Sequence, residues 1–291
     1  DIALTPQGCF TVRIYNPILS GPEGVRDIGI LKIKSHEPAL PLIQGGMAVG
    51  ISLDGLSAAV ASAGGGGTIG TAGIGMTIEG YARNFKQASI EGLKNVIRKA
   101  RSKTDGLLGV NIMVALTNYQ DMVVTALREK INMIISGAGL PLDLPSYLEE
   151  GSKTAIIPIV SSLKSAKVIL KRWFGKFRYI PDAFIVEGPK AGGHLGYRVE
   201  DLQSQEFSLS STIPQVRQLT EEIKREYGKD VPVIAAGGIF EREDVQEMFE
   251  LGASGVQVGT AFIGTQECDA DIRFKQALIE AKKEDIVIIK S

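Results

Sequence analysis

The stretch GPKAGGHLG, residues 188–196, places four glycines around His194, which is one of only two histidines in the chain. Glycine removes the side chain and lets another molecule approach the backbone closely. An imidazole changes its charge near neutral pH, so histidine is well suited to move protons in catalysis. We therefore predict that His194 is a general acid or base. The alternative is a structural role, in which the ring ties this loop to a backbone carbonyl.

Two further glycine-containing stretches predict a binding site for a phosphate group. Gly237 and Gly238 end one apolar run, and Gly259 and Thr260 end another. Neither stretch contains a lysine or an arginine, so backbone N–H groups and the Thr260 hydroxyl would have to bind the phosphate. The alternative interpretation is that these glycines only form tight turns.

A polar residue also interrupts an apolar run. Asn111 lies inside LLGVNIMV, residues 107–114, and an amide buried there needs hydrogen-bond partners. A flat heterocycle with donors and acceptors along one edge could supply them, and so could the neighbouring backbone.

The four consecutive glycines 64–67 are interpreted as a helix stop with tight packing. His36 precedes the first apolar run and is expected at the opposite end of the fold, without a chemical role.

The elements around these residues follow a regular pattern. From residue 41 onward short apolar runs alternate with helical patterns, and most runs are continuous, which is typical of parallel strands buried on both faces. The eight predicted strands are residues 41–47, 67–71, 107–114, 132–136, 154–160, 182–188, 231–238 and 254–260. This pattern predicts an α/β fold, a (β/α)8 TIM barrel, rather than a doubly wound open sheet. The active site of such a barrel lies at the carboxyl ends of its strands.

Helical periodicity separates the predicted strands. Apolar residues recur on one face of residues 90–100, 216–227 and 245–249. Gly228 and Gly252 follow the last two of these stripes and are suited to end a helix. The predicted fifth helix carries a basic cluster, interpreted either as a solvated surface or as a patch for an acidic carrier protein: Lys164, Lys167, Lys171, Arg172 and Lys176.

The first 40 residues fall outside this alternation. Residues 9–19 and 29–34 are predicted to pair as a hairpin that plugs the bottom of the barrel. The chain is thus divided into an N-terminal extension, residues 1–40, and a barrel, residues 41–291. The apolar ending EDIVIIKS predicts that the native chain continues beyond Ser291.

Composition excludes several classes of protein. The chain has 291 residues, 44% of them hydrophobic, and 32 basic against 33 acidic residues give a net charge of −1. No basic stripe is present, so we expect a small-molecule substrate and no nucleic acid. No apolar run is long enough to span a membrane, and the two cysteines lack the spacing of a metal site. We expect no metal and a cytoplasmic location, since the pattern of a signal peptide is missing.

Taken together, these motifs resemble the nitronate monooxygenase family, also called 2-nitropropane dioxygenases, and its flavin-dependent enoyl-ACP reductase relatives. The matching stretches lie in the same order over about residues 40–270 and are PLIQGGMAVGISLDGLSAAVASAGG, LGVNI, SGAGLP, FIVEGPKAGGHLG, PVIAAGGI and GVQVGTAFIGTQEC. The resemblance implies an oxidoreductase that binds FMN. His194 matches the active-site histidine of the family.

The resemblance also implies where FMN would bind. The phosphate would lie at the two glycine-containing strand ends, against Gly237, Gly238, Gly259 and Thr260. The ring and the ribityl chain would lie against Gly46, Met47, Asn111, Glu187, Gly192 and Gln257.

Details of the sequence divide between the two branches of this resemblance. Many nitronate oxygenases carry a lysine near the end of the fifth strand, where this chain has Pro158, Ile159 and Val160. This difference and SGAGLP favour the reductases, whereas MAVGIS and GPKAGGHLG favour bacterial nitronate monooxygenases. We predict FMN-dependent oxidation of alkyl nitronates by dioxygen, with NAD(P)H-dependent reduction of enoyl-ACP as the alternative. The substrate is then a nitronate or an enoyl thioester, and a homodimer is an open possibility.

Overall fold

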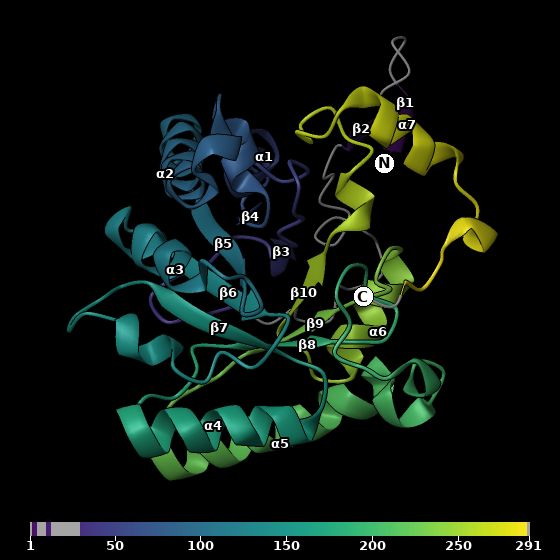
Figure 1. Cartoon of the computed structure of the whole chain (residues 1–291). Coiled ribbons are helices and arrows are strands. Elements are labelled where there is room, and N and C mark those ends of the chain that lie inside the picture. Colours follow the sequence, from purple (N-terminus) through teal and green to yellow (C-terminus); the bar gives the residue numbers. More distant parts are fainter. Residues whose placement is uncertain (1, 5–9, 13–29, 290–291) are drawn as a thin grey trace.

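The computed structural model of the chain describes residues 2–4, 10–12 and 30–289. Eight parallel strands close into a barrel in the order β10-β3-β4-β5-β6-β7-β8-β9 (Figure 1). Their bounds are β3 Leu42–Gln44, β4 Gly66–Gly70, β5 Leu107–Met113, β6 Met133–Gly137, β7 Ala155–Val160, β8 Phe184–Glu187, β9 Val233–Ala236 and β10 Gly255–Val258. Each strand overlaps one of the predicted apolar runs. The predicted TIM barrel is confirmed.

Helices surround this barrel on its outside (Figure 1). They are α1 Asp54–Ser62, α2 Phe85–Lys103, α3 Tyr119–Arg128, α4 Leu163–Phe177, α5 Leu209–Tyr227, α6 Arg242–Glu250 and α7 Ile272–Glu280. Between β6 and β7 the chain forms only a short 3-10 turn, η3 Leu144–Tyr147. Pro145 lies in the first turn of η3, where proline is tolerated because its missing N–H would have no partner there.

The predicted helix stops are present. Gly228 ends α5 with φ 68°, and Gly252 follows α6 with φ 96°. Both values lie in the left-handed region that glycine adopts without strain. A local sequence signal therefore determines where these two helices end.

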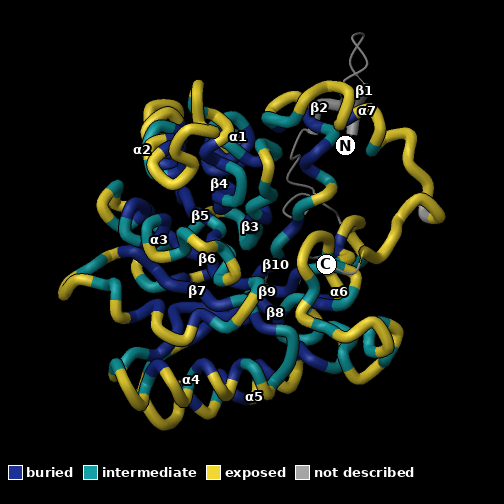
Figure 2. The backbone as a smooth tube through the Cα atoms, in the orientation of Figure 1, coloured by how far each residue is buried: buried dark blue, intermediate teal, exposed yellow. Residues whose placement is uncertain are grey.

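Two layers of apolar side chains form the core. The larger cluster lies between the strands and the helices, and Figure 2 shows the strands buried while the outer turns of the helices are exposed. The smaller cluster fills the barrel interior and contains Leu31, Ile33, Ile43, Leu107, Met133, Ile135, Ala155, Ile157, Ala183, Ile185, Ile234 and Ala236. Leu31 and Ile33 precede the first barrel strand, so the segment before β3 plugs one end of the barrel.

The strand pairing near the N-terminus differs from the predicted hairpin. β2 (Phe10–Val12) pairs antiparallel with β1 (Ile2–Leu4), and not with residues 30–34, the described part of the predicted partner. Ile33 instead exchanges two backbone hydrogen bonds of 2.9 Å with His36. Because Leu31 and Ile33 insert into the barrel, their segment is not available as a partner strand. The remainder of the predicted hairpin lies outside the described residues, and the domain boundary at residue 40 stays a prediction.

Candidate functional site

A layer of polar side chains lies at the carboxyl end of the barrel interior. Side chains alternate between the two faces of a strand. Leu107 faces inward on β5, and Ala183 and Ile185 face inward near and on β8, so Asn111 and Glu187 continue these inward rows. On β10, Gln257 pairs with inward-facing Ile43. On β4, a Cβ at Gly66 would meet Ile43 and Met133, so Thr68 faces inward as well. We call Thr68, Asn111, Glu187 and Gln257 the polar layer.

The loop after β3 crosses over this polar layer. A Cβ at Gly46 would lie 2.5 Å from the Cβ of Asn111 and 2.9 Å from the Cγ2 of Thr68. Only glycine therefore fits at position 46. The next residue is held by its backbone, because Met47 donates its N–H to the Ser52 hydroxyl at 3.0 Å. Its side chain reaches toward the end of β10, where a Cβ at Gly259 would lie 3.6 Å from the Met47 sulfur.

The loops after β8 and β9 pack against each other. Gly237 and Gly238 have φ values of 97° and 76°. A Cβ at Gly237 would lie 2.9 Å from the Cβ of Ala191, and one at Gly238 would lie 2.7 Å from the Cβ of Lys190. Both glycines are thus required by backbone conformation and by close approach. The aliphatic stem of Lys190 lies beside the glycine pair.

Several polar groups at this end of the barrel have no protein partner. Among the described residues, no acceptor pairs with the backbone N–H groups of Gly237, Gly238, Gly259 or Thr260. Within the same part of the chain, the buried Thr68 hydroxyl and the Oε1 of Gln257 lack a hydrogen bond. Buried polar groups are normally paired, so the unpaired Thr68 hydroxyl and Gln257 Oε1 indicate a ligand or water at this place. The four N–H groups belong to half-buried or exposed residues and are open to the same ligand.

Glu187 is the carboxyl group of the polar layer. Burial raises the pKa of Glu187 from 4.5 to about 7, because an ionised carboxylate is poorly solvated inside the barrel. Its backbone carbonyl accepts a hydrogen bond from the Tyr197 hydroxyl. Burial and the nearby Glu187 also raise the pKa of Tyr197, so this phenol stays protonated and remains a donor.

Comparison with known proteins identifies the family. A family model for nitronate monooxygenase matches residues 108–291. The chain is 30% identical to the probable nitronate monooxygenase of Staphylococcus aureus strain Newman, in an alignment that covers 86% of this chain and 72% of that protein. The chain belongs to the nitronate monooxygenase family. It is an oxidoreductase, as the predicted resemblance implied.

Solved structures agree with this assignment to the nitronate monooxygenase family. FabK from Thermotoga maritima is 30% identical, with a TM-score of 0.65 over 86% of this chain and 67% of that protein. A nitroalkane oxidase from Streptomyces ansochromogenes is 24% identical, with a TM-score of 0.65 over 82% of this chain and 70% of that chain, and supports the fold. Family members of this kind are flavoenzymes.

The structure brings most of the predicted site residues of this nitronate monooxygenase family member to one end of the barrel. Asn111, Glu187 and Gln257 lie in the polar layer, and the other predicted FMN contacts follow β3, β8, β9 and β10: Gly46, Met47, Gly192, Gly237, Gly238, Gly259 and Thr260. His194 lies in the loop after β8 and is exposed, without a hydrogen bond to another described residue. His36 contacts the carbonyl of Lys153 at 3.1 Å, before β7, and therefore lies at the opposite end as predicted.

Three further residues at this end of the barrel were not identified by the sequence analysis. Thr68 follows a run of glycines and carries no pattern that marks it as functional. Lys190 lies within GPKAGGHLG, but only the packing of two loops places its stem beside Gly238. Tyr197 directly follows the same stretch, and its hydroxyl bonds are visible only in the folded chain.

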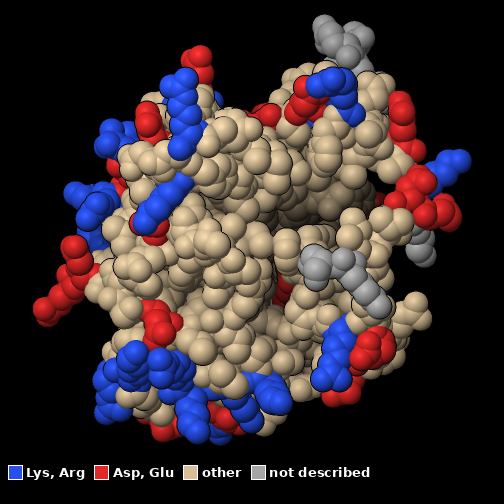
Figure 3. All heavy atoms as spheres, viewed as in Figure 1, with Lys and Arg blue, Asp and Glu red and all other residues tan. Residues whose placement is uncertain are grey.

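The surface around the barrel has an uneven charge distribution. The face seen in Figure 3 is hollowed near its middle, and mostly uncharged atoms line the hollow. Lys and Arg gather over α4 and α5 at the lower edge of this view. Within the described part of the chain, no helix is long and apolar enough to cross a membrane.

Proposed function

We propose that this protein is an FMN-dependent nitronate monooxygenase that oxidises alkyl nitronates with dioxygen. The observation that carries the proposal is the group of unpaired N–H donors after β9 and β10, directly beside the polar layer. Four N–H groups at adjacent strand ends suit a phosphate dianion. The unpaired Oε1 of Gln257 suits the donor edge of a flat heterocycle, and family membership makes FMN the natural candidate for both.

The residues present fit such a cofactor. The N–H groups of Gly237, Gly238, Gly259 and Thr260 would hold the phosphate, and Lys190 would add the positive charge that the two glycine-containing stretches lack. Asn111, Glu187 and Gln257 would face the ring, while Gly46 leaves room above the polar layer and Met47 and Gly192 would lie at its sides. When bound, FMN supplies the electron acceptor for the nitronate.

His194 would act on the substrate. A nitronate is already a carbanion and needs no base, whereas a neutral nitroalkane must first lose its α-proton. The imidazole of His194, exposed on the loop after β8, would take that proton. His194→Ala should therefore slow the turnover of neutral nitroethane by about 10²- to 10⁴-fold and leave turnover of ethylnitronate nearly unchanged. Equal rates of the variant and the parent protein with nitroethane would assign His194 a structural role.

An anaerobic mixing experiment tests the cofactor and the reaction together. The purified protein, supplied with FMN, should show flavin absorbance that bleaches rapidly with ethylnitronate and not with NADH or NADPH. Protein that stays colourless after FMN addition would reject the cofactor. A cytoplasmic, small-molecule role is part of the same proposal.

Enoyl-ACP reduction is the second candidate, favoured by the 30% identity to FabK over 86% of the chain. A reductase of this class must accept hydride from NAD(P)H before it reduces an acyl chain held on a carrier protein. Fast bleaching by NADH, with none by ethylnitronate, would replace the first proposal with this one. The basic cluster on α4 would then be the place to test for carrier binding.

A further inference from the structure

The loop that carries His194 has little to fix it locally. Three glycines lie within two residues of His194, and Gly193 has a φ of 87°. Among the residues that the structure describes, a Cβ at Gly192 or Gly193 would meet no atom within 4 Å, so neither glycine packs against this part of the chain. A chain of this composition has many accessible conformations. The position of the imidazole must therefore be set by anchors at the two ends of the loop.

The first anchor lies directly after β8. Gly188 donates its N–H to the carbonyl of Ala236 at 2.8 Å, and Ala191 donates to the carbonyl of Gly188 at 3.1 Å. These are backbone bonds that continue the strand and form a turn. They fix the chain up to Ala191, and no backbone hydrogen bond between described residues involves Gly192, Gly193 or His194.

The second anchor is the side chain of Tyr197. Its hydroxyl donates to the backbone carbonyl of Glu187 and also lies 3.2 Å from the carbonyl of Ser161. The hydroxyl thus joins the ends of β8 and β7. The ring packs edge-on against Phe207, with the centroids 5.6 Å apart. A weaker contact lies beside it, from the Ser161 hydroxyl to the carbonyl of Gly196 at 3.4 Å.

We propose that Tyr197 is a positioning residue for His194: its hydroxyl closes the loop onto the ends of β7 and β8 and so sets the place of the imidazole. The inference rests on the proposed role of His194 as the base. It assigns Tyr197 no contact with substrate. Because the acceptors are the carbonyl of Glu187, at the end of β8, and that of Ser161, directly after β7, the anchor point is rigid.

The variant Tyr197→Phe removes only the hydroxyl. With neutral nitroethane, kcat should fall by about 10- to 100-fold, since small misplacements of a catalytic group have effects of this size. Turnover of ethylnitronate and the Kd for FMN should stay at the parental values. In a His194→Ala background the same substitution should cause no further loss, because coupled residues are non-additive.

Tyr119→Phe is the matched control. The Tyr119 hydroxyl is also largely buried and lies 3.1 Å from the Ser136 hydroxyl, away from the β8 loop. This variant should lose stability to a similar degree but keep the parental ratio of nitroethane to ethylnitronate turnover. Backbone NMR order parameters at residues 192–194 should fall in Tyr197→Phe and stay unchanged in Tyr119→Phe.

Several results would overturn the inference. Unchanged order parameters at residues 192–194 in Tyr197→Phe would show that the hydroxyl does not hold the loop, whatever reaction the protein catalyses. An equal loss with nitroethane and ethylnitronate, or the same loss with and without His194, would show that Tyr197 does not act through the imidazole. A parent protein that turns over no nitronate would instead reject the proposed function and leave the order parameters to decide the anchor.

Discussion

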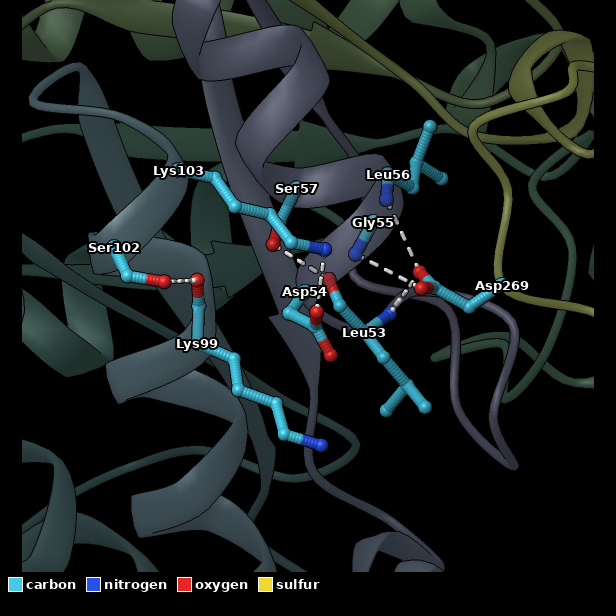
Figure 4. A network of polar contacts seen from close by, with 9 residues as sticks. All are labelled: Leu53, Asp54, Gly55, Leu56, Ser57, Lys99, Ser102, Lys103 and Asp269. Carbon is cyan, nitrogen blue, oxygen red and sulfur yellow. Dashed lines mark hydrogen bonds and ion pairs between the residues drawn. The ribbon is translucent and has the colours of Figure 1, made fainter.

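The carboxylate of Asp269 accepts the backbone N–H of Gly55 at 2.8 Å, across 214 positions of sequence (Figure 4). It also accepts the N–H groups of Leu53 and Leu56, at 2.7 and 3.1 Å. These donors lie at the start of α1. Its N-cap residue, Leu53, has an apolar side chain that cannot accept a hydrogen bond from them. The segment after the last strand thus caps the helix after the first barrel strand, where the barrel closes.

Removing this cap should destabilise the whole barrel. We expect Asp269→Ala to lower the free energy of unfolding by about 2 kcal/mol or more, since one helix cap contributes about 0.5–2 kcal/mol and this carboxylate serves three donors. Urea unfolding measures the change. Asp54→Asn is the control, because the Asp54–Lys103 pair beside it is partly exposed and such pairs contribute at most about 1 kcal/mol. Equal losses of unfolding free energy in Asp269→Ala and Asp54→Asn would contradict the capping role of Asp269.

The unpaired hydroxyl of Thr68 should reduce the stability of the cofactor-free protein. Thr68 is fully buried, and its Oγ1 has no partner among the described residues. Thr68→Val keeps the shape and removes the hydroxyl, so it should raise the free energy of unfolding by about 1–2 kcal/mol. Thr68→Ser keeps the hydroxyl and should lower stability by about 1 kcal/mol. A loss of stability in Thr68→Val would mean that the hydroxyl is paired in solution.

Glu187 should make stability depend on pH. Because burial raises its pKa from 4.5 to about 7, the protonated carboxyl is favoured in the folded state. The contribution of the protonated Glu187 carboxyl to the free energy of unfolding is fully present below pH 4.5 and is lost as the pH rises through 7. Glu187→Gln should therefore match the parent protein near pH 4.5 and exceed its stability at pH 8.5 by up to about 3 kcal/mol. Parallel curves for the two proteins across this range would contradict the shifted pKa.

Val49 holds an unfavourable backbone conformation in the loop after β3. Its φ is 54° although its side chain is β-branched, and the residue is 69% exposed. Val49→Gly should raise the free energy of unfolding by roughly 1 kcal/mol by relieving this strain. Val49→Ala keeps a Cβ at the same φ and should gain less. Thermal unfolding of the parent protein and the two variants measures their order of stability. A Val49→Gly variant less stable than the parent would contradict backbone strain at Val49.

Much of the fold follows from the sequence alone. The continuous apolar runs predict all the barrel strands, because strands buried on both faces need apolar side chains at every position. Gly228 and Gly252 mark helix ends because a left-handed residue is a local requirement. The glycine-containing strand ends of the site could also be identified, whereas the contacts that require glycine at Gly46, Gly237 and Gly238 come from segments distant in the sequence.

The contacts between segments distant in the sequence were decided only by the tertiary structure. Lys190 reaches Gly238, and Asp269 reaches Gly55, because closure of the barrel brings distant segments together. The pKa of Glu187 depends on burial among neighbouring strands, which no local pattern encodes. The partner of Phe10–Val12 was missed for the same reason, since the interior of the barrel takes up Leu31 and Ile33. Local sequence determines which residues can form a strand or a turn, whereas packing decides which of their side chains meet.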